Sequence, residues 1–413
     1  MRTVIVLGAG IVGVCTALQL RRRGWDVTLV DRRSPGQETS YGNAGIIQRE
    51  AVMPYPFPRD LATLLKVLRK GGVDVNYHAN AIPALLPRLV RYWQASSPRC
   101  YALYAQSFRS LIEHCIEEHR DLIEHAQAGH LIHTEGWLQA YRTPSLFAEA
   151  VDRATWLHSN FGVLSQILDS DALHEKESGL QTEMAGAVHW TQSWSVRDPG
   201  MLVEAYARLL QTWGARIILG DAQTLARTNT GWSVHTKEGQ IDASEVVIAL
   251  GPWAQTATRA LGYRLPLFIK RGYHQHYSNA QALSTPLLDS ENGIMMAPMS
   301  MGLRITTGAE FARHDAPATP IQLVKAERIA RSMVNLGSRV EASPWLGARP
   351  CTTDMNPIIG RAPRHKGLWF HFGHAHQGFT LGPASARLLA ELMTGELPFV
   401  DPRPFDPDRF KYA

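Results

Sequence analysis

Cysteine is scarce in this sequence. Four cysteines occur among 413 residues, at positions 15, 100, 115 and 351, and none forms a Cys-x-x-Cys pair or a metal-ligand spacing. We therefore expect a reducing compartment and no metal site.

Long apolar runs and strong charge are absent as well. No apolar run reaches the roughly 20 residues that a bilayer-spanning helix needs, and a strand expected from Thr3 leaves no room for a signal peptide. The net charge of +5 is small for this length, and Lys and Arg do not cluster beside a groove-reading module. We therefore expect a cytoplasmic protein that binds no nucleic acid. The 45% of hydrophobic residues suits a well-filled core, and the length favours two domains.

A strand–turn–helix–strand unit opens the chain. Residues 3–7 and 26–30 are apolar runs of β type, and residues 11–23 predict a helix that ends at Gly24. The first turn is Gly8-Ala9-Gly10-Ile11-Val12-Gly13, a G-x-G-x-x-G motif. In such a unit Gly8 forms the turn, Gly10 lets the backbone approach a pyrophosphate, and Gly13 packs the helix against the strand.

The place of this motif predicts dinucleotide binding. The helix N-terminus, at Ile11 and Val12, offers free amides and the positive end of the helix dipole to phosphates. Asp31 ends the second strand about twenty residues on, where an acidic side chain bonds ribose hydroxyls. We place the neighbouring Arg32 in the same site. A merely structural glycine turn would leave Asp31 unexplained.

The following loop favours FAD over a nicotinamide cofactor. Residues 38–47 are small, polar and glycine-rich, so that amides and hydroxyls can line an extended cofactor beyond the pyrophosphate. A nicotinamide enzyme needs no such loop here. We expect FAD contacts from Thr39, Ser40, Asn43, Ala44, Gly45 and Ile46.

Farther along the sequence, two later segments again have the alternating strand and helix pattern of the nucleotide-binding unit. We expect a helix over 60–70, two helical stretches over 83–127 and a hairpin over 130–141. Asp198-Pro199 is a good helix start, and this helix should run to about residue 213. Strands are expected at 215–219, 224–227, 232–236 and 245–250, the last ending in Gly251, and short strands alternate with turns over 264–310. The tail predicts a strand at 368–372, a glycine-rich loop and a helix over 383–393.

These returns predict an α/β protein with a discontinuous Rossmann-type FAD-binding domain. Residues 1–58, 192–262 and 343–413 would form that domain. Residues 59–191 and 263–342 would form an α+β substrate domain on a mixed β-sheet.

The loop after the second strand resembles a known family. The pattern E-T-S-x-x-N-A-G-x-I at 38–47 is similar to that of the D-amino-acid oxidase superfamily, nearest to the bacterial D-amino-acid and D-hydroxyproline dehydrogenases. Residues 198–215, 303–311, 347–350, 354–360 and 373–378 resemble further segments of the same family. The resemblance implies that a hydride leaves the substrate α-carbon for flavin N5, giving an imine that water hydrolyses.

The resemblance also implies which side chains act. Arg349 is our first candidate for the substrate carboxylate, because a planar guanidinium binds a carboxylate through two hydrogen bonds. His374 and His376 lie in a loop that should pass the flavin, although a loop histidine is as often a structural hydrogen-bonder. Tyr273 or His274 could bound the substrate, and alternation along a strand lets only one of them face inwards.

The loop that opens the last helix should hold the negative charge of the reduced flavin. Its amides and the helix dipole favour such a charge, although an ordinary helix-entry loop is the alternative. The residues expected to contact the cofactor there are Gly373, Gly378, Phe379, Thr380 and Leu381.

Several alternatives stay open. We expect non-covalent FAD, because the position that bears a flavin-linked cysteine in some sarcosine oxidases falls on Gly347. The electron acceptor could be a quinone or oxygen, and an oxidase of glycine, sarcosine or another secondary amine is a second hypothesis. A non-catalytic FAD-binding subunit is a third, and a nicotinamide-dependent dehydrogenase is a distant fourth.

The predicted helix over 60–70 raises the question of membrane contact. Leu61, Leu64, Leu65 and Leu68 recur at helical spacing beside Lys66, Arg69 and Lys70. A basic amphipathic helix can dock weakly on the inner face of a membrane, but more often such a helix simply packs on its own domain.

Overall fold

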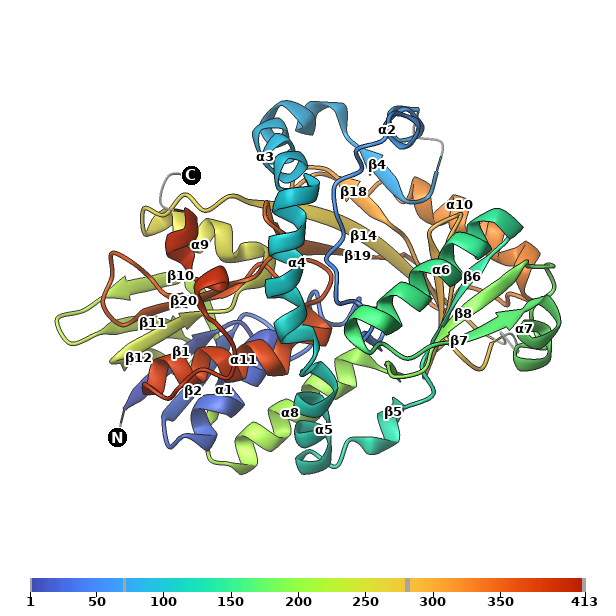
Figure 1. Ribbon diagram of the computed structural model, residues 1–413. Helices are drawn as coiled ribbons and strands as arrows, with labels where there is room; N and C mark the ends of the chain where they lie inside the picture. Colours follow the sequence, from blue (N-terminus) through green and yellow to red (C-terminus); the bar gives the residue numbers. More distant parts are fainter. Residues whose placement is uncertain (1, 70–71, 279–282, 411–413) are drawn as a thin grey trace.

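The chain forms two large β-sheets that lie side by side, with helices over both (Figure 1). The computed structural model describes residues 2–69, 72–278 and 283–410, so Lys70 lies outside the described part. Within that part, no helix is both long and apolar enough to cross a bilayer.

The first sheet carries the predicted nucleotide-binding unit. Its strand order is β12-β11-β10-β2-β1-β13-β21-β20, and the central strands run parallel. The strands are β1 (Thr3–Leu7), β2 (Asp26–Asp31), β10 (Arg216–Arg227), β11 (Trp232–Thr236), β12 (Gly239–Ala243), β13 (Glu245–Ile248), β20 (Ile358–Arg361) and β21 (Leu368–Phe372).

Both faces of this sheet are apolar, and helices pack on one of them. Val4 and Val6 pack in the same cluster as α1 (Ile11–Arg22), whereas Ile5 and Leu7 pack in a second cluster on the other side. On α1 lie α8 (Pro199–Thr212) and α11 (Gly378–Thr394), and α5 (Cys115–His125) packs on α11. A side chain at Gly13 would overlap the carbonyl oxygen of Gly8, so this glycine lets α1 lie close to β1.

The second sheet is mixed and larger. Its order is β4-β18-β14-β17-β16-β15-β6-β8-β7, and β19 (Trp345–Thr352) pairs with β14 beside this path. Its strands are β4 (Val75–Tyr77), β6 (Trp137–Tyr141), β7 (Gln166–Asp169), β8 (Gly186–Trp190), β14 (Leu267–Tyr277), β15 (Leu287–Asp289), β16 (Ile294–Met299), β17 (Gly302–Thr306) and β18 (Ala309–Phe311). Around it lie α6 (Pro144–Phe161), α7 (Ser170–Lys176) and α10 (Ile321–Met333).

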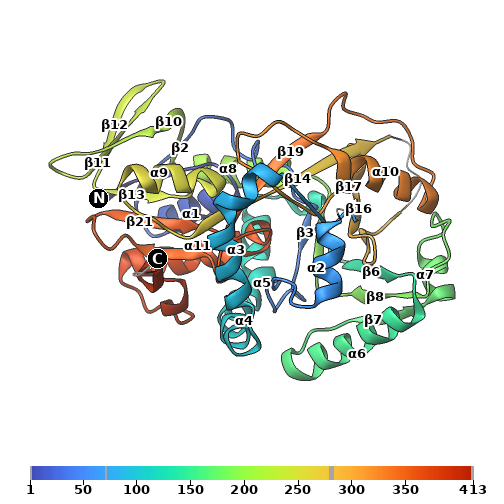
Figure 2. The same cartoon turned by 90° about the horizontal axis from the view of Figure 1, so that it is seen from above.

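Smaller elements join the two halves. A three-stranded sheet consists of β3 (Ile46–Ile47), β9 (Trp194–Val196) and β5 (Ile132–His133). Three helices, α2 (Leu61–Leu68), α3 (Ile82–Ala95) and α4 (Pro98–Ile112), lie at the junction between the two sheets (Figure 2). The short α9 (Ala254–Ala260) follows a 3-10 turn at Gly251–Trp253.

The α/β class and most predicted elements are confirmed, but three predictions are wrong. The expected hairpin over 130–141 does not form, because β5 pairs with β9 while β6 pairs with β8 and β15. Residues 82–125 form three helices rather than two, since the chain breaks at Ser96–Ser97 before Pro98 and again at His114. The strands expected at 215–219 and 224–227 are one strand, β10, with an irregularity between Asp221 and Ala226.

The last helix also begins five residues earlier than predicted, with Pro383 inside it. Proline has no N–H to donate to the carbonyl four residues before it. The ring of His119 replaces that donor, since its Nε2 lies 2.8 Å from the carbonyl oxygen of Phe379. Helix α11 can therefore continue through Pro383.

Candidate active site

One cavity of about 1080 Å³ connects the two ends of the chain that the sequence assigned to FAD. It begins at Gly8 and Asp31, passes the loop at 38–46, and reaches residues 371–379 before α11. Beyond that loop it continues between β14, β19 and the helices α2 and α3. Residues of both sheets line the cavity, so an extended cofactor and a substrate can share it.

The motif end of the cavity is built for a nucleotide. The Oδ2 atom of Asp31 accepts a hydrogen bond of 2.6 Å from the amide of Ala9, which fixes the carboxylate beside the turn. Burial raises the pKa of Asp31. The Oγ atom of Ser40 accepts from the amide of Ile11 at 3.0 Å, tying the 38–46 loop to the start of α1. Gly8 has a φ of 108°, a backbone conformation that favours glycine.

A second helix N-terminus meets the first at this cavity. A Cβ atom at Gly382 would lie 3.0 Å from Cγ1 of Ile11, so α11 and α1 pack closely near their N-terminal ends. Gly378 and Phe379 line the cavity at the start of α11. Since helix N-termini favour negative charge, this wall suits an anionic group.

Arg349 lies on β19, inside the cavity. Its Nη1 donates to the carbonyl oxygen of Gly308 at 3.0 Å, and its Nη2 to that of Thr307 at 3.4 Å. No carboxylate of the described residues lies within 4.0 Å of its guanidinium. Burial lowers the pKa of Arg349. A partly satisfied, unpaired guanidinium in such a place can bind a carboxylate from a ligand.

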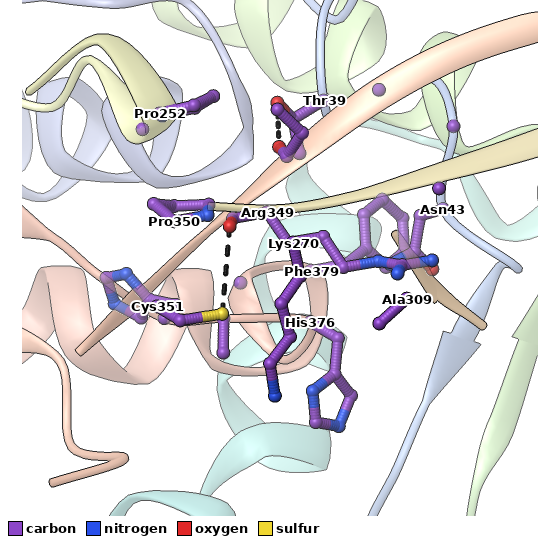
Figure 3. Close-up of a pocket in the computed structure, with 18 of the residues that line it drawn as sticks. Thr39, Asn43, Pro252, Lys270, Ala309, Arg349, Pro350, Cys351, His376 and Phe379 are labelled. Carbon is purple, nitrogen blue, oxygen red and sulfur yellow. Dashed lines mark hydrogen bonds between the residues drawn. The ribbon is translucent and has the colours of Figure 1, made fainter. Parts of the chain in front are cut away.

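Lys270 is a second cation in this wall, and sequence reasoning missed its role. It pairs across the strands with Arg349, and its Nζ lies 3.3 Å from the hydroxyl of Tyr92 and 4.6 Å from the centre of that ring. Arg349, Lys270 and His376 surround the same space (Figure 3). A lysine directly after the apolar run at 267–269 was the signal that could have pointed to it.

His376 faces this space with an unused ring nitrogen. Its Nε2 is buried and has no hydrogen-bond partner, and its ring packs edge-on against Tyr55 at 4.6 Å. Burial, together with the charges of Arg349 and Lys270, lowers the pKa of His376 to about 3. The imidazole is therefore neutral at physiological pH and can accept or donate one hydrogen bond.

His374 also lines the cavity but is held from behind. Its Nε2 shares a hydrogen bond of 3.0 Å with Oγ of Ser385 on α11. Burial lowers the pKa of His374 to about 3. This hydrogen bond to Ser385 fixes the loop at Gly373 to α11 and occupies the Nε2 atom of His374.

Tyr273 and His274 occupy the two sides of β14 but reach the substrate space poorly. Tyr273 lines the cavity, but its hydroxyl donates to Glu310 at 3.0 Å and accepts from the amide of Thr319 at 2.7 Å. His274 is absent from the cavity wall and stacks on Trp345, with 4.9 Å between ring centres. The expectation that His274 could bound the substrate is corrected by this stacking.

The loop at 41–43 is fixed by an arginine on the other sheet. Nη1 of Arg304 donates to the carbonyl oxygens of Tyr41 (2.9 Å) and Asn43. Its Nε donates to Nε2 of His276 at 2.9 Å, and Nδ1 of His276 is bonded to Glu341. Sequence reasoning gave no role to this chain of hydrogen bonds, because it joins Arg304, His276 and Glu341 to a loop far away in the sequence.

The family of FAD dependent oxidoreductases called DAO matches residues 3–392. The chain belongs to this family. A D-amino-acid oxidase of Bradyrhizobium diazoefficiens is 29% identical, with 99% of both chains covered. A D-amino acid dehydrogenase of Cereibacter sphaeroides is 30% identical over 96% of this chain and 93% of the relative. Glycine oxidase from Geobacillus kaustophilus shares the fold, with a TM-score of 0.73 at 20% identity over 99% of each chain.

As a member of the DAO family, the protein depends on FAD, and its residues fit that cofactor. Most of the predicted contacts line the one cavity: Gly8, Gly10, Ile11, Val12, Asp31, Arg32, Thr39, Ser40, Asn43, Ala44, Ile46, Gly251, Gly373, Gly378 and Phe379. Together they form a continuous path from the G-x-G-x-x-G turn to the start of α11.

Four predicted cofactor residues do not line the cavity. Gly13 and Gly45 lie against backbone, at Gly8 and Val196 respectively, and so shape the turn and the loop. The hydroxyl of Thr380 donates to the carbonyl oxygen of Ile46 at 3.3 Å, and Leu381 is buried in the core. Because α11 begins at Gly378, Thr380 and Leu381 already belong to its buried face.

Proposed function

We propose that this protein oxidatively deaminates a D-amino acid, with transfer of the α-carbon hydride to flavin N5 and hydrolysis of the resulting imine by water. The observation that carries the proposal is Arg349, an unpaired cation in the cavity that also holds the nucleotide-binding turn. The names of the relatives, D-amino-acid oxidase and D-amino acid dehydrogenase, support it. FAD supplies the two-electron acceptor when it is bound.

The substrate is held by its carboxylate in this proposal. The guanidinium of Arg349 binds the carboxylate, which fixes the α-carbon in the cavity. The nearby charge of Lys270 adds to the attraction and disfavours a protonated amine, which must lose its proton before it can give up a hydride. The neutral ring of His376 offers Nε2 as a partner for the free amine.

The remaining wall has room for a side chain. Phe57, Leu64, Leu89, Tyr92 and Phe311 line the part of the cavity beyond Lys270. Because this lining is apolar and aromatic, we favour an amino acid with an apolar side chain, including D-proline-like substrates, over a glycine or sarcosine oxidase.

The cofactor and the two sheets have separate tasks in this proposal. Residues 1–58, 192–262 and 343–413 bind FAD without a covalent link, and residues 59–191 and 263–342 shape the substrate side. Some elements cross this division, since β19 with Arg349 pairs with β14 of the substrate sheet and α5 packs on α11.

Anaerobic bleaching of the bound flavin tests the proposal. We expect D-amino acids with apolar side chains to bleach it, and L-amino acids, glycine and N-methyl amines to do so far more slowly. The variant Arg349→Ala should keep FAD but need a much higher substrate concentration, whereas the exposed Arg403→Ala should behave as wild type.

Three outcomes would contradict parts of the proposal. Fastest bleaching by glycine or sarcosine would favour the amine-oxidase alternative, and no bleaching by any amine would favour a non-catalytic FAD-binding subunit. Unchanged KM in Arg349→Ala would remove this residue from the site. Peroxide formation compared with quinone-dye reduction then distinguishes oxygen from a quinone as the acceptor.

A further inference from the structure

Three side chains that can bind a metal ion meet beside Trp345, outside the cavity wall. His274 and His276 lie two residues apart on β14, so both point to the same face of the sheet. Glu341 reaches them from the segment after α10, in which the amide of Val340 donates to the carbonyl oxygen of His276 at 2.9 Å. Sequence reasoning gave no sign of this cluster, because 65 residues separate His276 from Glu341.

The ring of His274 has two unused nitrogens. The residue is 1% exposed, and neither Nδ1 nor Nε2 has a hydrogen-bond partner among the residues that the structure describes. The backbone of Gly42 lies near the ring without a hydrogen bond to it. Burying a polar group without a partner destabilises a protein. Coordination of an ion through one of these nitrogens offsets part of that cost.

Glu341 is held as a metal-binding carboxylate would be. Its Oε2 accepts from Nε2 of Gln275 at 2.6 Å and from the amide of His276 at 3.0 Å, and its Oε1 is bonded to Nδ1 of His276. Hydrogen bonds of this kind orient the ligands of metal sites. The side chain of Glu341 is 25% exposed, so an ion can reach it from solvent.

The spacing of the cluster is close to that of a zinc site. The three ligand atoms, one from each side chain, all lie within 4.8 Å of one another. Zn²⁺ bonds of about 2.0–2.2 Å place tetrahedral ligands roughly 3.3 Å apart, so the cluster has to contract by up to roughly 1.5 Å. Two imidazoles and one carboxylate form a donor set that binds Zn²⁺ with water in the remaining position.

Arg304 opposes an ion at this place. Its Nε donates to Nε2 of His276 at 2.9 Å. Since arginine has only donors, Nδ1 of His276 carries the proton of the bond to Glu341. An ion bound at Nδ1 moves this proton to Nε2, where it meets the N–H of Arg304, and the two positive charges repel each other. Arg304 must therefore leave His276 when the ion binds.

Arg304 also couples this cluster to the cofactor path. Its Nη1 donates to the carbonyl oxygens of Tyr41 and Asn43. Gly42 and Asn43 line the cavity along this path. An ion that displaces Arg304 from His276 thus also disturbs the hold of Arg304 on the loop.

We propose that the cluster of His274, His276 and Glu341 binds one Zn²⁺ or a similar divalent metal ion. The ion displaces Arg304 from His276 and thereby weakens the binding of FAD. The coupling is reciprocal, so bound FAD weakens the binding of the ion by the same factor. The proposal uses the dependence of the family on FAD and makes no assumption about the amino-acid substrate.

Equilibrium dialysis of the FAD-loaded, chelator-treated protein against Zn²⁺ tests the site. Wild type should bind about one Zn²⁺ per chain more than His274→Phe, which keeps an aromatic ring beside Trp345 but has no ligand atom. Glu341→Gln should bind Zn²⁺ roughly tenfold more weakly or worse. The exposed residues His130 and Glu238 provide the controls, and His130→Gln and Glu238→Gln should bind as wild type.

Release of FAD from the same protein during dialysis tests the coupling. Saturating Zn²⁺ should raise the dissociation constant for FAD roughly fivefold or more in wild type and leave it unchanged in His274→Phe. In Arg304→Leu, Zn²⁺ should bind more tightly than in wild type, because the opposing charge is gone, and should not change the affinity for FAD.

Wild type that binds no more Zn²⁺ than His274→Phe would overturn the site, as would wild-type Zn²⁺ affinity in Glu341→Gln. Equal dissociation constants for FAD with and without Zn²⁺ would overturn the coupling. His274→Phe loses no hydrogen bond of the ring, so it should unfold at the wild-type temperature, which excludes misfolding as the cause of lost Zn²⁺ binding. These experiments contain no amino acid, so their failure and failure of the proposed activity are separate results.

Discussion

The guanidinium of Arg349 lies directly over Gly272 on the neighbouring strand. A Cβ atom at residue 272 would lie 2.7 Å from Nη2 of Arg349, closer than real contacts allow. The two residues are diagonal neighbours on β19 and β14, since Arg349 pairs with Lys270 and Gly272 pairs with Gly347. The absence of a side chain at Gly272 is thus what lets Arg349 reach across its own sheet to the carbonyls of Thr307 and Gly308.

This relationship predicts the effect of a single methyl group. Gly272→Ala should displace Arg349 and raise KM for the amino acid roughly 10- to 100-fold, the equivalent of about 1.5–3 kcal/mol for a hydrogen bond to a charged group. FAD binding should persist. Gly129→Ala, where a Cβ atom would meet open space, is the matched control. Steady-state kinetics would contradict the prediction if both variants had the wild-type KM.

The lowered pKa of His376 predicts the shape of a pH profile. With a pKa of about 3, the ring is neutral throughout the range from pH 5.5 to 9 and has no proton to gain or lose there. His376→Gln should therefore lower kcat/KM by roughly fivefold, through loss of about 1 kcal/mol of hydrogen bonding, without changing the shape of the profile. An inflection near neutral pH that disappears in the variant would instead identify His376 as a proton carrier.

Buried histidines should make stability depend on pH. Burial lowers the pKa of His119 to about 4, against about 6.5 in the unfolded chain. Between these values the unfolded state holds one more proton, so the free energy of unfolding falls by about 1.4 kcal/mol for each pH unit of acidification. The contribution is complete above pH 6.5 and is lost as the pH falls.

Urea unfolding of His119→Gln measures this contribution. Glutamine can still donate to the carbonyl of Phe379, but it does not titrate. Between pH 6.5 and 4.5 its stability should fall less steeply than that of wild type, by about 1.4 kcal/mol per pH unit. The exposed His130→Gln serves as control and should keep the wild-type slope. Equal slopes for His119→Gln and wild type would refute the assignment.

Arg304 should control the affinity for FAD without touching the amino acid. Arg304→Leu leaves the carbonyl oxygens of Tyr41 and Asn43 without their donor and frees the loop that lines the cofactor path. We expect the dissociation constant for FAD to rise by roughly tenfold or more, as for the loss of about 1.5–3 kcal/mol. Equilibrium dialysis against FAD measures this. Arg339→Leu, on an exposed arginine paired with Glu327, should have no such effect.

The flavin should be released by acid precipitation. Residue 347 is a glycine and has no thiol, and Cys351 is buried with its pKa raised, chiefly by burial. Neither position therefore offers a thiolate for a covalent link. We expect a colourless pellet and a yellow supernatant; a yellow pellet would show a covalent bond.

The sequence alone was enough for the features that depend on near neighbours along the chain. The strand at 3–7, the helix after Gly10 and the strand ending at Asp31 follow from apolar period and glycine spacing within about thirty residues. The same holds for α8, which the Asp198 side chain caps through the amide of Met201. These signals led to FAD and to the fold class; the family match confirms the cofactor, and the similar solved structure confirms the fold.

Only the tertiary structure decided which side chains meet in the substrate space. Lys270 and Arg349 are neighbours because two strands pair across about 80 residues, and Arg304 reaches Tyr41 across more than 260. His274 has the same strand pattern as Lys270, yet Trp345 covers it. Apolar periodicity and secondary-structure propensity describe one strand or helix at a time. Hydrogen bonding between distant strands and competition for buried space determine which residues of that strand or helix face a ligand.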